Sequence, residues 1–108
     1  MRFIWKQTNH EGECIDWIHA LGFTAHGLII NPGAWTHYAY AIRDAIELVP
    51  APCIEVHLSD IRKRAKKEPF RGISVTKGVC QGQVMGHGWL SYVYGIEKLL
   101  EVLGKSKV

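Results

Sequence analysis

Two stretches of this 108-residue chain point to its fold, Leu28-Ile-Ile-Asn-Pro-Gly-Ala-Trp-Thr-His37 and Cys53-Ile-Glu-Val-His-Leu-Ser59. Each begins with apolar residues typical of a buried strand and continues into polar residues where that strand ends. In open sheets of parallel strands, ligands bind just beyond the carboxyl ends of the strands. Two polar clusters at successive strand ends therefore predict one shared pocket.

Strand-like and helix-like segments alternate along the whole chain. Apolar spacing and turn residues predict strands at residues 3–5, 28–30, 53–58 and 79–85. They predict helices from residue 9 or 11 to 21, then at 36–48, 61–67 and 89–103, with Gly104 ending the last one. This alternation predicts an α/β protein with a mostly parallel sheet and helices on both faces. Right-handed crossovers then bring Asn31–His37 and His57–Asp60 to the same edge.

Length and composition narrow the class of protein. One domain over residues 1–108 is expected for a chain this short. The hydrophobic content of 47% and the charged content of 21% are typical of a soluble globular protein. No apolar run is long enough to span a membrane, and the first residues lack the apolar core of a signal peptide, which favours the cytoplasm. Cys14, Cys53 and Cys80 have no Cys-x-x-Cys spacing, so we expect free structural thiols.

The net charge of +3 is concentrated in one segment, because six of the thirteen Lys and Arg residues lie between residues 62 and 71. Such a run can bind nucleic-acid phosphates or line a pocket for a small anion, although a solvated helix face is more common. Nucleic-acid binding is accordingly the least favoured function. The histidines and cysteines have no metal-ligand spacing and no glycine-rich nucleotide motif occurs, so neither a metal nor a nucleotide site is predicted.

The first polar cluster begins with a sharp turn. Pro32 restricts the backbone and Gly33 permits conformations that other residues avoid, so the turn can present the Asn31 amide to a ligand. A plain strand-to-helix connection explains the same residues. His37 and Asp44 are seven positions apart on the predicted helix and would share a face, where both can bind hydroxyls or lie at the surface.

The second polar cluster pairs a carboxylate with an imidazole. Glu55 and His57 lie two positions apart on a predicted strand and therefore point to the same face. Glu55 could orient the imidazole and select its tautomer, which makes His57 a candidate general acid or base. The backbone N–H groups of Leu58 and Ser59, with the Ser59 hydroxyl, could bind a carboxylate; an ordinary Ser59 helix cap is the alternative.

These segments together resemble the type II 3-dehydroquinase (3-dehydroquinate dehydratase) family over nearly the whole chain. The resemblance rests on Asn9-His-Glu-Gly-Glu13 with Ile15-Asp-Trp-Ile18, on Asn31–His37 followed by Arg43-Asp-Ala45, and on Glu55–Asp60 and Glu68-Pro-Phe-Arg71. That family is flavodoxin-like, assembles as a dodecamer of trimers, and dehydrates 3-dehydroquinate to 3-dehydroshikimate through an enolate. It uses neither a metal nor an organic cofactor.

The resemblance implies a role for each residue of the two clusters. His57 would be the general acid that protonates the departing hydroxyl, supported by Glu55, and Asn31 would hold the water that stabilises the enolate. The partners would be the small-molecule substrate and further copies of the chain, with neither nucleic acid nor a membrane. The residues that bind the substrate carboxylate would be Leu58 and Ser59, and those that bind ring oxygens or order the site would be Asn31, His37, Asp44 and Arg71.

The chain departs from the family pattern at its start. The family begins with a strand ending in Gly-Pro-Asn and a mobile lid with an arginine and the tyrosine base, whereas this chain begins at the equivalent of the second strand. We therefore expect a flavodoxin-like three-layer sheet without the first strand and lid, in a domain N-terminally truncated relative to the family. A catalytically silent relative, which binds a carboxylate ligand or assembles with a complete partner, is the alternative function. None of the four tyrosines of this chain occupies the lid motif, so the resemblance gives none of them the role of the base; they are Tyr38, Tyr40, Tyr92 and Tyr94.

Overall fold

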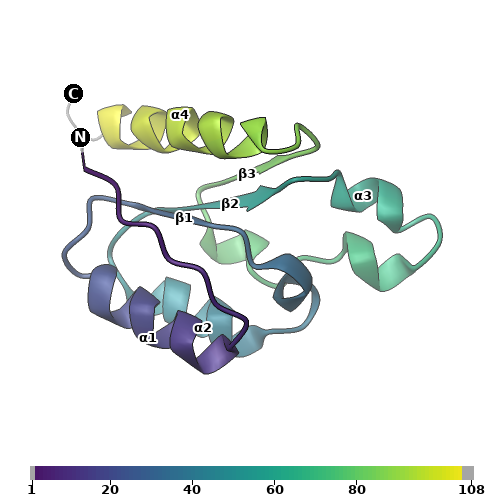
Figure 1. Cartoon of the computed structure of the whole chain (residues 1–108), viewed down its shortest axis with the longest axis horizontal. Coiled ribbons are helices and arrows are strands. Elements are labelled where there is room, and N and C mark those ends of the chain that lie inside the picture. The colour runs from purple at the N-terminus through teal and green to yellow at the C-terminus, as the bar shows by residue number, and fades with distance from the viewer. Residues whose placement is uncertain (1, 106–108) are drawn as a thin grey trace.

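The fold is a small parallel sheet between two layers of helices. The structure is a computed structural model that describes residues 2–105 (Figure 1). The strands β1, β2 and β3 form one parallel sheet in that order, with α4 on one face and α1 and α2 on the other (Figure 1). The elements in chain order are α1 (Glu11–Leu21), β1 (Leu28–Ile30), the 3-10 helix η1 (Gly33–His37), α2 (Tyr40–Leu48), β2 (Cys53–His57), α3 (Ile61–Arg64), the 3-10 helices η2 (Pro69–Gly72) and η3 (Lys77–Val79), β3 (Gly82–Met85) and α4 (Leu90–Lys105). The predicted parallel sheet with helices on both faces is confirmed.

The central strand β2 organises both sides of the core. All five of its residues are buried, because β1 and β3 flank it and helices cover both faces. On one face, Ile18 of α1 and the α2 residues Ile42 and Ile46 pack with Cys53 in a single apolar cluster. In register, Ile30 lies opposite Glu55 and Met85 opposite His57, so the carboxyl ends of the three strands meet at one edge.

The predicted strand at residues 3–5 is wrong. Residues 2–8 form neither helix nor strand, and they pair with none of the three described strands. A strand is stable only when a neighbour satisfies its backbone N–H and C=O groups. Phe3, Ile4 and Trp5 are exposed instead, so their apolar character does not reflect a place in the sheet.

The predicted helix over residues 36–48 is broken into two pieces. Tyr38, with φ −152° and ψ −11°, ends η1, and Ala39, with φ −84° and ψ 79°, precedes α2. Helical periodicity therefore does not continue from His37 to Asp44. The prediction that these two residues share a face of one helix is wrong. The apolar spacing across this segment could not reveal the break because both pieces bury residues against the same core.

Smaller differences lie at the ends of other elements. Helix α3 stops at Arg64, and its cap is Asp60, which accepts a hydrogen bond from the Arg62 backbone N–H. Strand β3 begins only at Gly82, because Val79 belongs to η3 and Cys80 and Gln81 form a bend. Helix α4 continues through Gly104, so the predicted stop at this glycine is wrong.

Close packing of α4 on β2 depends on Gly95. A Cβ at this position would lie 2.7 Å from Val56 Cγ2. We expect Gly95→Ala to lower the free energy of unfolding by about 1–3 kcal/mol, because a packed interface does not accept an added methyl group without strain. Chemical denaturation followed by circular dichroism measures this loss.

Gly104→Ala is the matched control for this substitution. Gly104 belongs to the same helix, and a Cβ there would meet nothing within 4 Å. The change should be neutral or stabilise the protein by up to about 1 kcal/mol through helix propensity. Equal losses at the two positions would contradict the proposed close contact at Gly95.

The three cysteines are free, as the sequence predicts. Cys53 is buried in β2, and the hydrogen bond that its thiol donates to Cys80, together with burial, raises the pKa of that thiol well above the ordinary range. A thiol in this state is a poor nucleophile because the thiolate is the reactive form. Among residues 2–105, no helix is both long and apolar enough to cross a membrane.

Candidate active site

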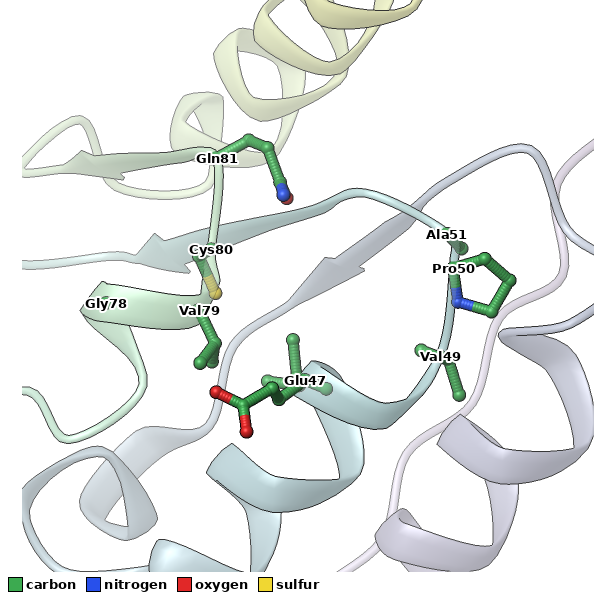
Figure 2. A pocket seen from close by; sticks show the side chains of 9 residues that line it. Glu47, Val49, Pro50, Ala51, Gly78, Val79, Cys80 and Gln81 are labelled. Carbon is green, nitrogen blue, oxygen red and sulfur yellow. The ribbon is translucent and has the colours of Figure 1, made fainter.

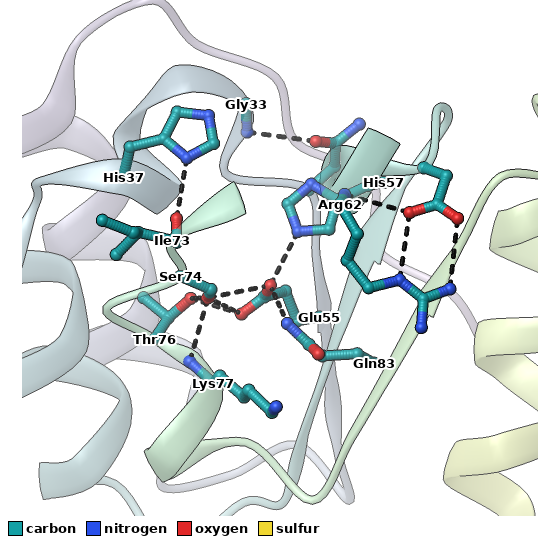
Figure 3. Close-up of polar contacts among 12 residues, drawn as sticks. Gly33, His37, Glu55, His57, Arg62, Ile73, Ser74, Thr76, Lys77 and Gln83 are labelled. Carbon is teal, nitrogen blue, oxygen red and sulfur yellow. Dashed lines mark hydrogen bonds and ion pairs between the residues drawn. The ribbon is translucent and has the colours of Figure 1, made fainter. Parts of the chain in front are cut away.

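Glu55 and His57 form a hydrogen-bonded pair at the carboxyl end of β2, as the spacing on a strand predicts. His57 Nε2 lies 2.7 Å from Glu55 Oε2 (Figure 3). Both side chains are buried, with exposed fractions of 0% for Glu55 and 4% for His57. Because an ionised carboxylate can only accept, Nε2 must carry the hydrogen, and Nδ1 is left for a ligand.

Four side chains donate hydrogen bonds to the Glu55 carboxylate (Figure 3). Besides His57, these are Ser74 at 2.8 Å, Gln83 at 2.7 Å, and Thr76. Burial by itself raises the pKa of Glu55, but the hydrogen bonds from His57, Thr76, Gln83 and Ser74 outweigh it and lower the pKa from 4.5 to about 2. Glu55 is therefore an anion at neutral pH and accepts the hydrogen bond from His57 Nε2.

Three of these donors, Ser74, Thr76 and Gln83, are not among the predicted site residues. Gln83 lies beside Glu55 because the two residues are register partners in β2 and β3. Ser74 and Thr76 come from the segment between η2 and η3, two positions apart, and both reach the carboxylate. The alternation of Ser74-Val75-Thr76 is a weak signal that both hydroxyls face one way, but only the fold shows what they face.

Asn31 lies in the turn after β1. Its Oδ1 accepts a hydrogen bond from the Gly33 backbone N–H at 3.1 Å (Figure 3), and its Nδ2 donates to the Tyr92 hydroxyl at 3.0 Å. Gly33 has a φ of +58°, a left-handed conformation that favours glycine. The turn thus has the predicted geometry, and the amide has partners on both sides.

His37 is held by the segment that contains η2. Its Nδ1 lies 2.7 Å from the carbonyl oxygen of Ile73 (Figure 3), so Nδ1 donates and Nε2 is left for a ligand. Phe70 packs edge-on against the imidazole, with ring centroids 5.7 Å apart. The same segment continues into Ser74, so it connects the His37 ring with the Glu55 carboxylate.

The remaining predicted site residues are at the surface. Leu58 and Ser59 follow directly on His57 and are exposed. Asp44 is exposed on α2. Arg71 donates from Nε to Glu68 at 2.9 Å, and no described hydrogen bond or ion pair joins either Asp44 or Arg71 to His57. The hollow beside Arg71 has a volume of about 290 Å³ and is lined by Arg64, Lys67, Glu68 and Arg71.

A second hollow, of about 270 Å³, lies at the opposite edge of the sheet (Figure 2). It is formed by the end of α2, the turn before β2 and the residues before β3, and none of the predicted site residues lines it. Within residues 2–105, no group of three or more His, Cys, Asp and Glu side chains is placed to hold a metal ion. The residues that line the hollow include Glu47, Val49, Pro50, Ala51, Gly78, Val79, Cys80 and Gln81.

Fold and site together define a parallel α/β protein with a carboxylate-supported histidine at the carboxyl edge of its sheet. The family described as Dehydroquinase class II matches residues 1–100. The 3-dehydroquinate dehydratase of Roseiflexus castenholzii is 52% identical over 99 residues, and that of Desulfitobacterium hafniense is 55% identical over 98 residues. The chain belongs to the class II dehydroquinase family.

Solved structures agree with this assignment. The type II dehydroquinase of Butyrivibrio crossotus superposes with a TM-score of 0.80 at 48% identity, and that of Propionibacterium acnes with a TM-score of 0.77 at 37% identity. These matches cover 86% and 92% of this chain, but 63% and 64% of the solved chains. The two curated relatives are covered over 61% and 65% of their length, against 92% and 91% of this chain. The predicted flavodoxin-like architecture is confirmed, and the chain spans less than two thirds of its relatives.

Proposed function

We propose that this chain is a lyase that dehydrates 3-dehydroquinate to 3-dehydroshikimate by acid–base catalysis. The observation that carries the proposal is the buried Glu55–His57 pair, whose free Nδ1 lies at the ligand-binding edge of the sheet. The relatives named 3-dehydroquinate dehydratase supply the reaction and the substrate. An enzyme of this kind serves the shikimate or quinate pathway.

The reaction removes a proton next to a ketone and then a hydroxyl group. Loss of the proton to a general base, a role that is assigned to none of residues 2–105, leaves the electron pair in an enolate, which reforms the ketone as the C–O bond to the leaving hydroxyl breaks. Imidazolium His57 would give its Nδ1 proton to that hydroxyl, which departs as water. The Glu55 anion, bound at Nε2, would hold the ring with Nδ1 directed to the hydroxyl. The water that stabilises the enolate would be held by Asn31.

The other predicted residues would bind the substrate. The exposed backbone after His57, at Leu58 and Ser59, would take the carboxylate. His37 Nε2, with Nδ1 fixed by Ile73, would bind a ring hydroxyl. Asp44 and Arg71 would bind ring oxygens or order the site, and Arg71 would first have to loosen its contact with Glu68.

Further proposals rest on the family resemblance. We propose a single domain over residues 1–108, a cytoplasmic location, and a homo-oligomer based on trimers that acts without a metal or organic cofactor. Large apolar side chains at the surface, with exposed fractions of 72% for Trp5 and 71% for Trp89, support contacts with further copies of the chain. Nucleic acid and membranes are not among the proposed partners.

A binding-only role is the second candidate. It is supported by the Glu55–His57 pair and by the exposed backbone at Leu58 and Ser59, which could bind a carboxylate whether or not a proton is removed. His57 and Ser59 could then bind a carboxylate ligand without turnover, or the chain could assemble with a complete partner. Loss of a general base costs about 10²–10⁴-fold in rate.

A single assay distinguishes these functions. The purified chain is mixed with 3-dehydroquinate, and the conjugated enone of 3-dehydroshikimate is followed by ultraviolet absorbance, with the chain carrying His57→Asn as the control. Turnover above that control supports the enzyme. Calorimetric binding of 3-dehydroshikimate without turnover supports the binding-only role, and a folded chain that neither turns over nor binds overturns both.

A further inference from the structure

The orientation of the Asn31 amide follows from its neighbours. The Gly33 backbone N–H can only donate, so the Asn31 atom that faces it at 3.1 Å must be the oxygen Oδ1. The nitrogen Nδ2 then faces Tyr92, and it must donate to the hydroxyl oxygen 3.0 Å away. The amide therefore has one orientation in which both contacts are hydrogen bonds with correct polarity.

Tyr92 holds its end of this contact from a different part of the fold. It lies on α4, 61 residues further along the chain, and is half-buried. Trp5 packs edge-on against its ring, with centroids 6.1 Å apart and an interplanar angle of 68°. The Tyr92 oxygen accepts from Asn31, so the hydroxyl hydrogen of Tyr92 is free to donate. Among residues 2–105, Asn31 is the only hydrogen-bond partner of this hydroxyl group.

We propose that Tyr92 is a positioning residue that holds the Asn31 amide, at the carboxyl edge of the sheet, in the orientation that the Gly33 N–H dictates. Without the Tyr92 hydroxyl, Asn31 Nδ2 would have no hydrogen-bond partner among residues 2–105, and of the contacts described only the one from Gly33 would hold the amide. For ligand binding the inference rests on the proposed function. Held in this way by Gly33 and Tyr92, the amide would favour cyclic carboxylates that carry a ring carbonyl over rings that lack one.

The contact can be tested without any ligand. In the side-chain amide spectrum of ¹⁵N-labelled protein, the Asn31 signal is identified by its loss in Asn31→Asp. We expect Tyr92→Phe to shift this signal and to speed the exchange of its hydrogens with water, because the hydroxyl acceptor is gone. In the unsubstituted protein, a nuclear Overhauser effect should join the amide hydrogens to the Tyr92 ring.

Tyr94→Phe is the matched control. Tyr94 is on the same helix and also loses one hydroxyl, but its ring packs against His87, with centroids 4.9 Å apart. The Tyr94→Phe substitution should leave the Asn31 side-chain amide signal unchanged. An Asn31 signal that does not respond to Tyr92→Phe, or that lacks the Overhauser effect to Tyr92, would overturn the proposal.

Ligand binding tests the consequence. We expect Tyr92→Phe to raise the dissociation constant of 3-dehydroshikimate about 3–10-fold, the range of one neutral hydrogen bond. The constant for cyclohex-1-enecarboxylate, which has the carboxylate but no ring oxygens, should not change. In a chain that already carries Asn31→Ala, Tyr92→Phe should add nothing, because Tyr92 acts through Asn31.

The outcomes separate the positioning role from the function. Additive losses in the double variant, or equal weakening of both ligands, would overturn the role of Tyr92 in ligand recognition. If the unsubstituted chain binds neither compound, the proposed function fails, and the spectrum of the Asn31 amide alone decides whether Tyr92 positions it.

Discussion

Replacing His57 by asparagine is expected to lower kcat for the dehydration of 3-dehydroquinate about 10²–10⁴-fold, the usual contribution of a positioned general acid. The shorter amide cannot be protonated at neutral pH and does not reach the Glu55 carboxylate in the same way. Initial rates from the ultraviolet assay at saturating substrate measure the loss. The KM should change far less, because the proton is transferred in the transition state.

The fold must survive this substitution for the result to be decisive. His57→Asn removes one of four donors to the Glu55 carboxylate, so circular dichroism must show that the variant remains folded at the assay temperature. The matched control is His19→Asn, at an exposed histidine in the last turn of α1. Turnover that persists in the His57 variant would remove His57 from the acid role.

Replacing Glu55 by glutamine is expected to lower the free energy of unfolding at pH 7 by about 3 kcal/mol, in the range for one member of a buried charged pair. The amide has the size of the carboxyl group, but its NH₂ group would face side chains that now all donate. The Ser74 and Thr76 hydroxyls can turn to accept, whereas the Gln83 amide would have to flip and His57 would have to change its tautomer. Urea unfolding at pH 7 measures the difference.

The pH dependence of stability gives a separate test of Glu55. Its pKa falls from 4.5 to about 2 on folding, so the carboxylate stabilises the fold fully above about pH 4.5. This contribution, about 3 kcal/mol by linkage, is lost as the pH falls from 4.5 towards 2. The unfolding free energies of the Glu55→Gln variant and the unsubstituted protein should therefore converge over this interval.

A carboxylate outside the site provides the control for both measurements. Glu47 is exposed on α2, and Glu47→Gln should leave the unfolding free energy at pH 7 within about 0.5 kcal/mol of the original value. A Glu55→Gln variant whose curve runs parallel to that of the unsubstituted protein down to pH 2 would show that the Glu55 carboxylate does not depend on its four donors.

Local pattern was sufficient for much of the fold and for the centre of the site. The strands predicted at 28–30 and 53–58 are present as β1 and β2, and the spacing of Glu55 and His57 places both on one face because strand side chains repeat every two residues. The Asn31-Pro-Gly turn is also local, since Pro32 and Gly33 restrict and permit backbone angles regardless of what surrounds them.

Contacts between distant segments required the tertiary structure. Ser74, Thr76 and Gln83 reach Glu55 across separations of 19, 21 and 28 residues, and Tyr92 reaches Asn31 across 61. The apolar residues 3–5 predicted a strand that the described sheet does not contain. The break at Tyr38 divides a segment whose sequence predicted one continuous helix. Periodicity determines which way a side chain points along its own element, but its partner depends on which elements pack beside it and in what register.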